Sequence, residues 1–74
     1  MSQFNVGDVV VLQMRLALKL GEYDLILEEG TVGRVRDTGI GDCKVQFHIS
    51  EKISIQASVY DPLIKVDPHR VWGR

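Results

Sequence analysis

The sequence predicts an all-β fold, a small barrel of five short strands, from three observations. Apolar and polar residues alternate along most of the chain, which is the period of a half-buried strand. No window has the apolar spacing and length of an ordinary helix. Glycine and proline interrupt the alternating segments at short intervals, as they do in turns. The 74 residues suffice for one domain, so we assign residues 1–74 to a single domain with residues 67–74 as a C-terminal tail.

Residues 43–49 and 52–59 predict a β-hairpin. Every second residue of each segment is apolar, and a short turn centred on Glu51 would join them. This register sets Phe47 opposite Ile55, so the apolar faces of the two strands coincide. The expected inward set is Cys43, Val45, Phe47, Ile49, Ile53, Ile55, Ala57 and Val59.

A bend is predicted within residues 31–37. Val32 and Val35 are three positions apart, so a regular strand would send their side chains to opposite faces. A β-bulge at Gly33 would return both to the core, and glycine inside a strand is typical of bulges and tight bends. Residues 38–42 then form the turn that leads into the hairpin.

The other strands lie near the two ends of the chain. One is predicted over residues 9–14, followed by a long first loop over residues 16–30 in which residues 25–27 are extended. A turn at Asp61 precedes the last strand over residues 63–66. Five short strands, a long first loop and a turn before the last strand describe a small SH3-like barrel.

Three stretches resemble a known family. FNVGDVVVL, EEGTVGRVRDTG and KVQF look like the pattern of the NifZ family of nitrogen-fixation accessory proteins, F-x-x-G-D-x-V, then G-[ST]-V-G-x-V-x-x-x-G, then V-x-F. Similar residues recur in the photosystem I PsaE subunit, in KOW domains and in the nitrile hydratase β-subunit. The resemblance implies an SH3-like barrel and an accessory role in assembly. The matching residues are Phe4, Gly7, Asp8, Val10, Gly30, Thr31, Val32, Gly33, Val35, Gly39, Val45 and Phe47.

The charge and composition of the chain limit the classes of function that are expected. Nine basic and ten acidic residues leave a net charge of -1, which argues against binding nucleic acid by bulk electrostatics. Cys43 is the only cysteine, so no internal disulfide can form and a reducing cytoplasm is the expected compartment. The N-terminus has no signal-peptide pattern, and no apolar run approaches the ~20 residues of a membrane span. We therefore expect no membrane association.

The soft and imidazole ligands do not predict a metal site. Cys43, His48 and His69 lack metal-site spacing, and Cys43 should point inward while His48 points outward from the same strand. The same geometry argues against a Cys–His catalytic pair. We expect no metal, no cofactor and no catalytic activity.

The outward face of residues 31–37 and 43–49 is the first candidate site. In the predicted pairing Arg36 comes opposite Lys44, and facing like charges are mildly destabilising. Two explanations stay open: nearby acidic residues neutralise a solvated face, or the face binds an anion or an acidic partner. The acidic neighbours are Asp37, Asp42, Glu28 and Glu29. The candidate partner-binding residues are Arg34, Arg36, Lys44, Gln46 and His48.

The leucine-rich segment at residues 16–27 is the second candidate site. A small core already supplied by the other strands cannot enclose all its apolar side chains, so they either close the barrel end or form a subunit or partner interface. We expect a homodimer through this segment. Its candidate interface residues are Leu16, Leu18, Leu20, Leu25, Ile26 and Leu27.

The function predicted from the sequence is a non-catalytic protein-binding or assembly module. One alternative is a KOW-like module associated with nucleic acid through Arg34, Arg36 and Lys44. Another is an oligomeric enzyme similar to the type II dihydrofolate reductases, whose pore strand carries V-Q-I-Y. Residues 55–58, Ile-Gln-Ala-Ser, resemble that strand at the glutamine and the apolar residue before it.

Overall fold

The computed structural model describes residues 3–67 and 69. These residues form seven β-strands and one short 3-10 helix, with no α-helix among them, so the predicted all-β class is confirmed. The elements are β1 (Val9–Leu12), β2 (Leu16–Leu20), β3 (Tyr23–Leu27), β4 (Val32–Thr38), β5 (Asp42–His48), β6 (Ser54–Tyr60), η1 (Asp61–Leu63) and β7 (Ile64–Val66).

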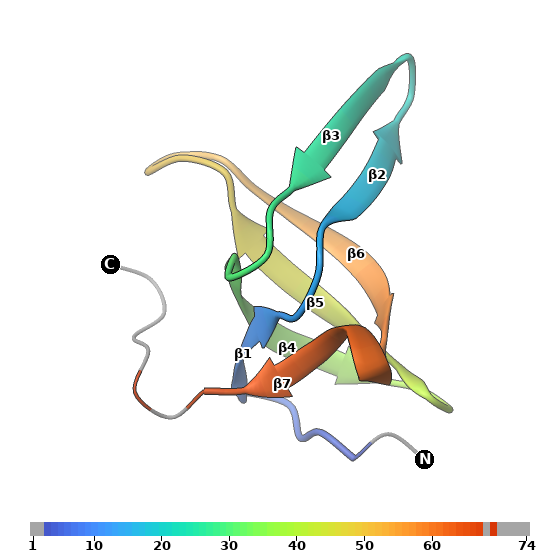
Figure 1. Ribbon diagram of the computed structural model, residues 1–74, viewed down its shortest axis with the longest axis vertical. Helices are drawn as coiled ribbons and strands as arrows, with labels where there is room; N and C mark the ends of the chain where they lie inside the picture. Colours follow the sequence, from blue (N-terminus) through green and yellow to red (C-terminus); the bar gives the residue numbers. More distant parts are fainter. Residues whose placement is uncertain (1–2, 68, 70–74) are drawn as a thin grey trace.

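The strands form two antiparallel sheets (Figure 1). One sheet has five strands in the order β6-β5-β4-β1-β7, and β2 pairs with β3 in a hairpin that projects from the body. The core lies between the inner face of the larger sheet and the base of the hairpin. Its buried members are Phe4, Val10, Leu12, Leu27, Val35, Cys43, Val45, Phe47, Val59 and Ile64.

The predicted long first loop is wrong except that residues 25–27 are extended, because most of it forms the β2–β3 hairpin. Leucines at every second position of β2 face apolar residues of β3, with Leu16 opposite Leu27 and Leu20 opposite Tyr23. Gly21 begins the connecting turn with φ of +62°, which suits the first central position of a two-residue hairpin turn. The alternation of leucines along residues 16–20 is therefore the signal of a strand, and the prediction of a loop did not take it into account.

The β5–β6 hairpin has the predicted register. Phe47 pairs with Ile55 and Val45 pairs with Ala57, so the apolar faces coincide. The predicted inward positions of Ile49 and Ile53 are wrong. Both lie outside the strands, and Ile53 is 58% exposed, because the connecting turn lifts them away from the core.

The bulge in β4 lies at Arg36 and not at Gly33. The pairing between β4 and β5 shifts between Val35 and Asp37, whereas Gly33 pairs regularly with Phe47. Without a bulge at Gly33, Val32 and Val35 point to opposite faces of the strand. Val32 pairs with Val11, is half-buried and does not belong to the core cluster, so its predicted core position is also wrong.

Gly33 serves close packing in place of a bend. A Cβ atom there would lie 2.5 Å from Val45 Cγ1 and 2.8 Å from Phe47 Cδ1. The side chains of β5 therefore occupy the volume that a residue larger than glycine would need.

The first and last strands are shorter than predicted. β1 ends at Leu12, and the next amide, that of Gln13, donates to Leu63 O at 2.8 Å. Leu63 ends the 3-10 helix η1, whose first turn contains Pro62, so the last strand begins at Ile64. Of the predicted tail, residues 68 and 70–74 lie outside the described residues, and Asp67 N donates to Val9 O at 3.0 Å.

We predict that Gly33→Ala lowers the free energy of unfolding by about 1–3 kcal/mol, the usual cost of overpacking a core. Urea unfolding would measure it. Val45→Ala removes the nearest methyl group, so Gly33→Ala should cost less in that background. An equal cost in both backgrounds would contradict the proposed contact.

Candidate functional site

The outward face of β4 and β5 brings together four of the five predicted partner-binding residues. Arg34 lies opposite Gln46, as predicted, and alternation along β5 places Lys44 and His48 on the same outward side. Gln46 Nε2 donates to Ser54 Oγ at 2.8 Å, which links this face to β6. We call the side chains of Arg34, Lys44, Gln46 and His48 the outward polar face.

The predicted facing of Arg36 and Lys44 is wrong. The bulge inserts Arg36 into β4, and the residue opposite Lys44 is Asp37. Opposite charges therefore face each other where like charges were expected, which is a favourable cross-strand pairing. Arg36 is exposed at the irregular part of the strand.

Arg34, Arg36 and Lys44 have no ion-pair partner within residues 3–67 and 69. The ion pair present there joins Arg15 Nε to Glu28 Oε1 at 3.4 Å, and both side chains are well exposed. Glu28 therefore points to the hairpin side and does not neutralise Arg34 or Lys44 by contact. The outward polar face keeps accessible positive charge beside Asp37.

Arg34 and Gln46 are the most enclosed groups of the outward polar face. Both side chains are half-buried, and Arg34 Nε and Gln46 Oε1 are buried without a hydrogen-bond partner. One is a donor and the other an acceptor, and the two residues are direct cross-strand neighbours. A hydrogen bond between the two would satisfy both groups, so their burial does not by itself indicate an external ligand.

The β2–β3 hairpin has one apolar and one mixed side. Direct cross-strand partners share a face, so Leu16, Leu18, Leu20, Tyr23, Leu25 and Leu27 lie on one side. Ile26 lies on the other with Ala17, Lys19 and Asp24. Five of the six predicted interface residues therefore share a face, and Ile26 does not.

The apolar side of the hairpin is buried at its base and exposed at its tip. Leu27 is buried in the core, so it does not contribute to a free surface, and Leu16, Leu18 and Leu25 are partly buried against the core. Leu20 is 43% exposed and Tyr23 is 76% exposed. We call Leu18, Leu20, Tyr23 and Leu25 the apolar face. The core thus encloses the hairpin base and leaves Leu20 and Ile26 exposed, as expected for a core that cannot enclose every apolar side chain of this segment.

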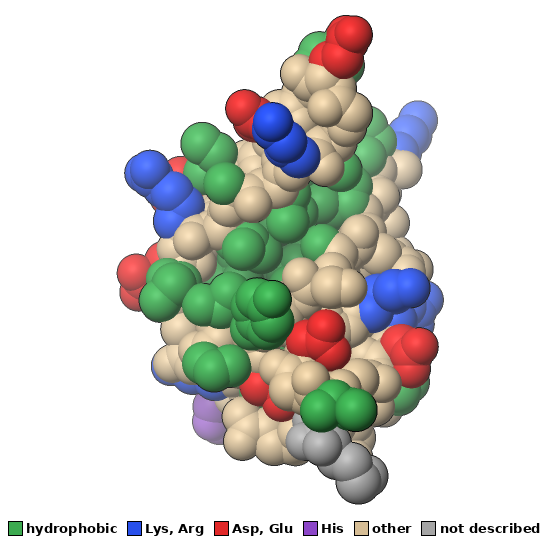
Figure 2. Space-filling view, turned by 90° about the vertical axis from the view of Figure 1, so that its right-hand side faces the viewer, with side chains coloured by type: hydrophobic (Ala, Val, Ile, Leu, Met, Phe, Trp, Pro, Cys, Tyr) green, Lys and Arg blue, Asp and Glu red, His purple; other side chains and the backbone are tan. Residues whose placement is uncertain are grey.

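The apolar face belongs to a larger hydrophobic area. Ile55 of β6 and Leu63 of η1 are also partly buried against the core, and the hairpin, β6 and η1 lie on the same side of the molecule in Figure 1. Figure 2 looks onto that side and shows hydrophobic side chains gathered below the projecting hairpin. The core is thus incompletely covered between the hairpin and β6.

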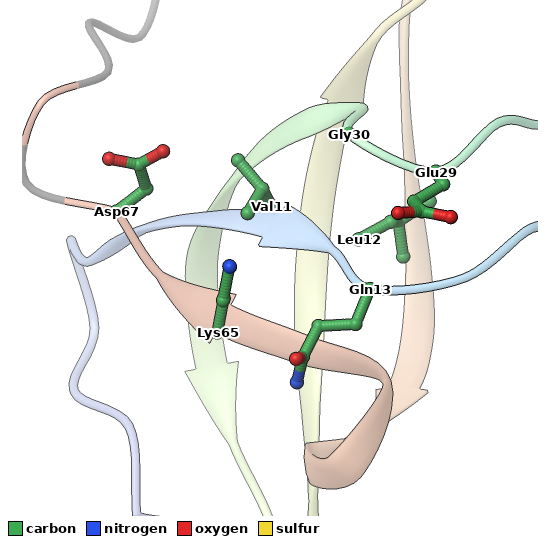
Figure 3. A pocket seen from close by; sticks show the side chains of 7 residues that line it. All are labelled: Val11, Leu12, Gln13, Glu29, Gly30, Lys65 and Asp67. Atoms are coloured by element: carbon green, nitrogen blue, oxygen red, sulfur yellow. The ribbon is translucent and has the colours of Figure 1, made fainter.

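A hollow of about 220 Å³ lies beside β1 and β7 (Figure 3). Lys65 and Gln13 line it together with apolar side chains, and the carboxylates of Glu29 and Asp67 lie toward opposite ends. Its lining contains no imidazole, thiol or hydroxyl group. The hollow can therefore hold a small polar group through an amine and an amide, and its lining has carboxylates at both ends.

A smaller hollow of about 130 Å³ lies at the turn between β4 and β5. Asp37, Asp42 and Lys44 line it with the buried Cys43. The glutamine proposed for a dihydrofolate reductase-like pore, Gln56, is exposed on β6 and lines neither hollow.

Asp61 is a buried acid that the sequence analysis treated only as part of a turn. Its Oδ1 accepts from Cys43 Sγ at 3.4 Å, and its Oδ2 accepts from the backbone amide of Gln3 at 3.2 Å. Its own amide donates to Gly41 O at 3.0 Å. Asp61 thus joins η1 to β5 and to the N-terminal segment. Cys43 is buried as predicted, and this contact indicates a structural role for both side chains.

We predict that Asp61→Ala lowers the free energy of unfolding by about 1–3 kcal/mol, because the buried Cys43 thiol and the partly buried Gln3 amide lose their acceptor. Asp37→Ala is the matched control, since Asp37 is exposed and its carboxylate accepts from the adjacent Thr38 amide. It should change stability by about 0.5 kcal/mol or less. Equal losses in urea unfolding would show that Asp61 does not join these segments.

Within the described ranges, no group of three or more His, Cys, Asp or Glu side chains is arranged to hold a metal ion. The structure likewise has, over the same residues, no helix with the length and apolar character of a membrane span. Neither known protein families, nor curated proteins, nor solved structures provide a match to this chain.

Proposed function

We propose that this protein is a non-catalytic protein-binding or assembly module built on an SH3-like barrel. The strand order β6-β5-β4-β1-β7 supports the barrel assignment, as do the long excursion between β1 and β4 and the 3-10 turn before β7. The accessory role implied by the resemblance to the NifZ family agrees with this proposal and shares its test.

The observation that carries the proposal is the apolar face. Leu20 and Tyr23 project from a two-stranded hairpin, which has little stability of its own in water. Burying exposed apolar surface contributes roughly 25 cal/mol per Å², so a partner that covers this tip would both bind and stabilise the hairpin. A large aromatic side chain with a polar hydroxyl is also typical of residues at protein interfaces.

The chemistry of the two hollows supports a binding role over catalysis. The larger one combines an amine, an amide and two carboxylates but has no hydroxyl, thiol or imidazole group. The thiol that lines the smaller one belongs to Cys43, which is 1% exposed and donates to Asp61. A buried, hydrogen-bonded thiol is typical of a structural cysteine.

A KOW-like association with nucleic acid is the second candidate. The specific observation in its favour is that Arg34, Arg36 and Lys44 have no ion-pair partner in the part of the chain that the structure describes. The face carries Asp37 opposite Lys44 and has no phenylalanine, tyrosine or tryptophan on β4 or on the outward side of β5, so stacking of bases is not favoured there.

We predict that Leu20→Lys combined with Tyr23→Lys abolishes partner binding while the fold is kept. The control is Ile26→Lys, because Ile26 is 51% exposed on the opposite side of the same hairpin. Proteins retained from an extract of the source cells by each immobilised variant would be quantified by mass spectrometry. The control should retain the same set as the unmodified chain, and the double variant should lose it. Identical sets for both variants would contradict binding through the apolar face.

A salt titration distinguishes the second candidate. For a protein-binding module, we expect no association with a single-stranded or duplex oligonucleotide at physiological ionic strength, as the net charge is -1. A KOW-like module would bind, and its affinity would fall steeply with log salt as counterions return to the phosphates. Arg34→Glu with Arg36→Glu should then weaken binding and flatten that slope.

A further inference from the structure

β6 is an open edge of the larger sheet. It is the first strand in the order β6-β5-β4-β1-β7, and all seven of its residues pair with β5 without a register shift. None of the other described strands pairs with its far side. A regular strand of this length offers a row of backbone donors and acceptors to an added strand.

The hydrogen bonds at the two ends of the hairpin show which residues face that open side. Ile49 N donates to Ile53 O at 2.8 Å, and Asp61 N donates to Gly41 O at 3.0 Å. Antiparallel partners exchange bonds at alternate positions, so the odd-numbered residues of β6 bond to β5. The N–H and C=O groups of the even-numbered residues point to the open side. These residues are Ser54, Gln56, Ser58 and Tyr60.

β6 lacks the usual protections of an edge strand. Its sequence SIQASVY contains no charged residue and no proline, and its pairing contains no bulge. The opposite edge differs, because β7 has three residues and carries Lys65 at its centre. The unprotected edge is therefore confined to one side of the sheet.

We infer that the open edge of β6 pairs with β6 of a second copy in an antiparallel, two-fold arrangement. Pairing centred on Ala57 sets even-numbered residues opposite even-numbered ones, as the direction of the free groups requires. Ser54 then meets Tyr60 of the partner subunit, and Gln56 meets the partner subunit's Ser58. Ile55 lies beside Val59 of the partner subunit on the inner side.

A second copy of the chain fits the open edge of β6 because the sequence of β6 is complementary to itself in the antiparallel direction. The two-fold pairing keeps apolar residues with apolar residues and polar residues with polar ones, and the seam contains no charges that repel. The small side chain of Ala57 at the centre allows close approach. Ile55 and Ala57 are only half-buried on the inner side, so the second strand also covers apolar surface. A two-fold contact closes on itself, and the short β7 does not extend the sheet further.

The test combines mass with amide exchange on the full chain. Sedimentation equilibrium over a micromolar concentration series should show a monomer–dimer equilibrium. Hydrogen exchange followed by NMR should slow at Gln56 and Ser58 as the concentration rises, while the amides of Ile55 and Ala57, already bonded to β5, should be protected at every concentration.

Gln56→Lys with Ser58→Lys should give a monomer at every concentration, because lysines would then face each other across the seam. Thr38→Lys with Ser50→Lys adds the same charge at exposed positions off the open edge and should leave the dimer intact.

A second variant tests the backbone directly. Ser58→Pro removes an N–H that faces the open side, which an edge strand tolerates, so the chain should fold as a monomer. A monomer mass for the unmodified chain would overturn the inference, as would protection of Gln56 and Ser58 that does not change with concentration, which would indicate a segment of the same chain on this edge. A dimer that survives the lysine variant but is lost in Leu20→Lys with Tyr23→Lys would also overturn it and would assign the contact to the apolar face. The proposed function stands or falls separately, since it depends on that face.

Discussion

The packing of Phe47 and Val45 against the backbone of Gly33 is the contact on which the rest of the larger sheet depends. Gly33 lies in β4, between β1 and β5, and it pairs with Val10 on one side and Phe47 on the other. Because glycine has no side chain, the residues of β5 fill the space above it on the inner face. Alternation then decides the direction of every neighbour, so Arg34 and Gln46 must lie on the outer face.

The bulge at Arg36 decides the charge pattern of that outer face. One inserted residue replaces a repulsive arrangement of Arg36 and Lys44 by an attractive one between Asp37 and Lys44. Regular pairing would place two positive charges opposite each other, which an anionic ligand could neutralise. With Asp37 opposite Lys44, this reason to expect an anionic ligand is weaker. The facing pair of Asp37 and Lys44 thus argues against nucleic-acid binding, although no acidic side chain of the described residues lies within ion-pair distance of Arg34.

The size of the core explains why the proposed binding surfaces lie on one side of the molecule. The hairpin covers the core only with its base, where Leu27 is buried, and its tip extends beyond the body (Figure 1). Ile55 remains half-buried where the hairpin does not reach it. The apolar face and the open edge of β6 are two consequences of the same incomplete cover: one offers apolar area and the other offers backbone hydrogen bonds. A small domain cannot cover all its apolar surface, and a partner can supply the missing part.

The sequence by itself determined the all-β class, the β5–β6 hairpin with its register and the inward direction of Cys43, because alternation with a period of two is a local signal. The same signal was present in the leucines of β2 and could have indicated the hairpin. Only the tertiary structure decided where β4 bulges, since the position depends on whether the volume beside Gly33 is filled by residues from another strand. It also decided the role of Asp61, whose carboxylate accepts from Cys43, eighteen residues away, and from an amide at the N-terminus. Contacts between distant segments leave no periodic trace in a single sequence, so the buried acid and the open edge of β6 emerge only when the strands are assembled.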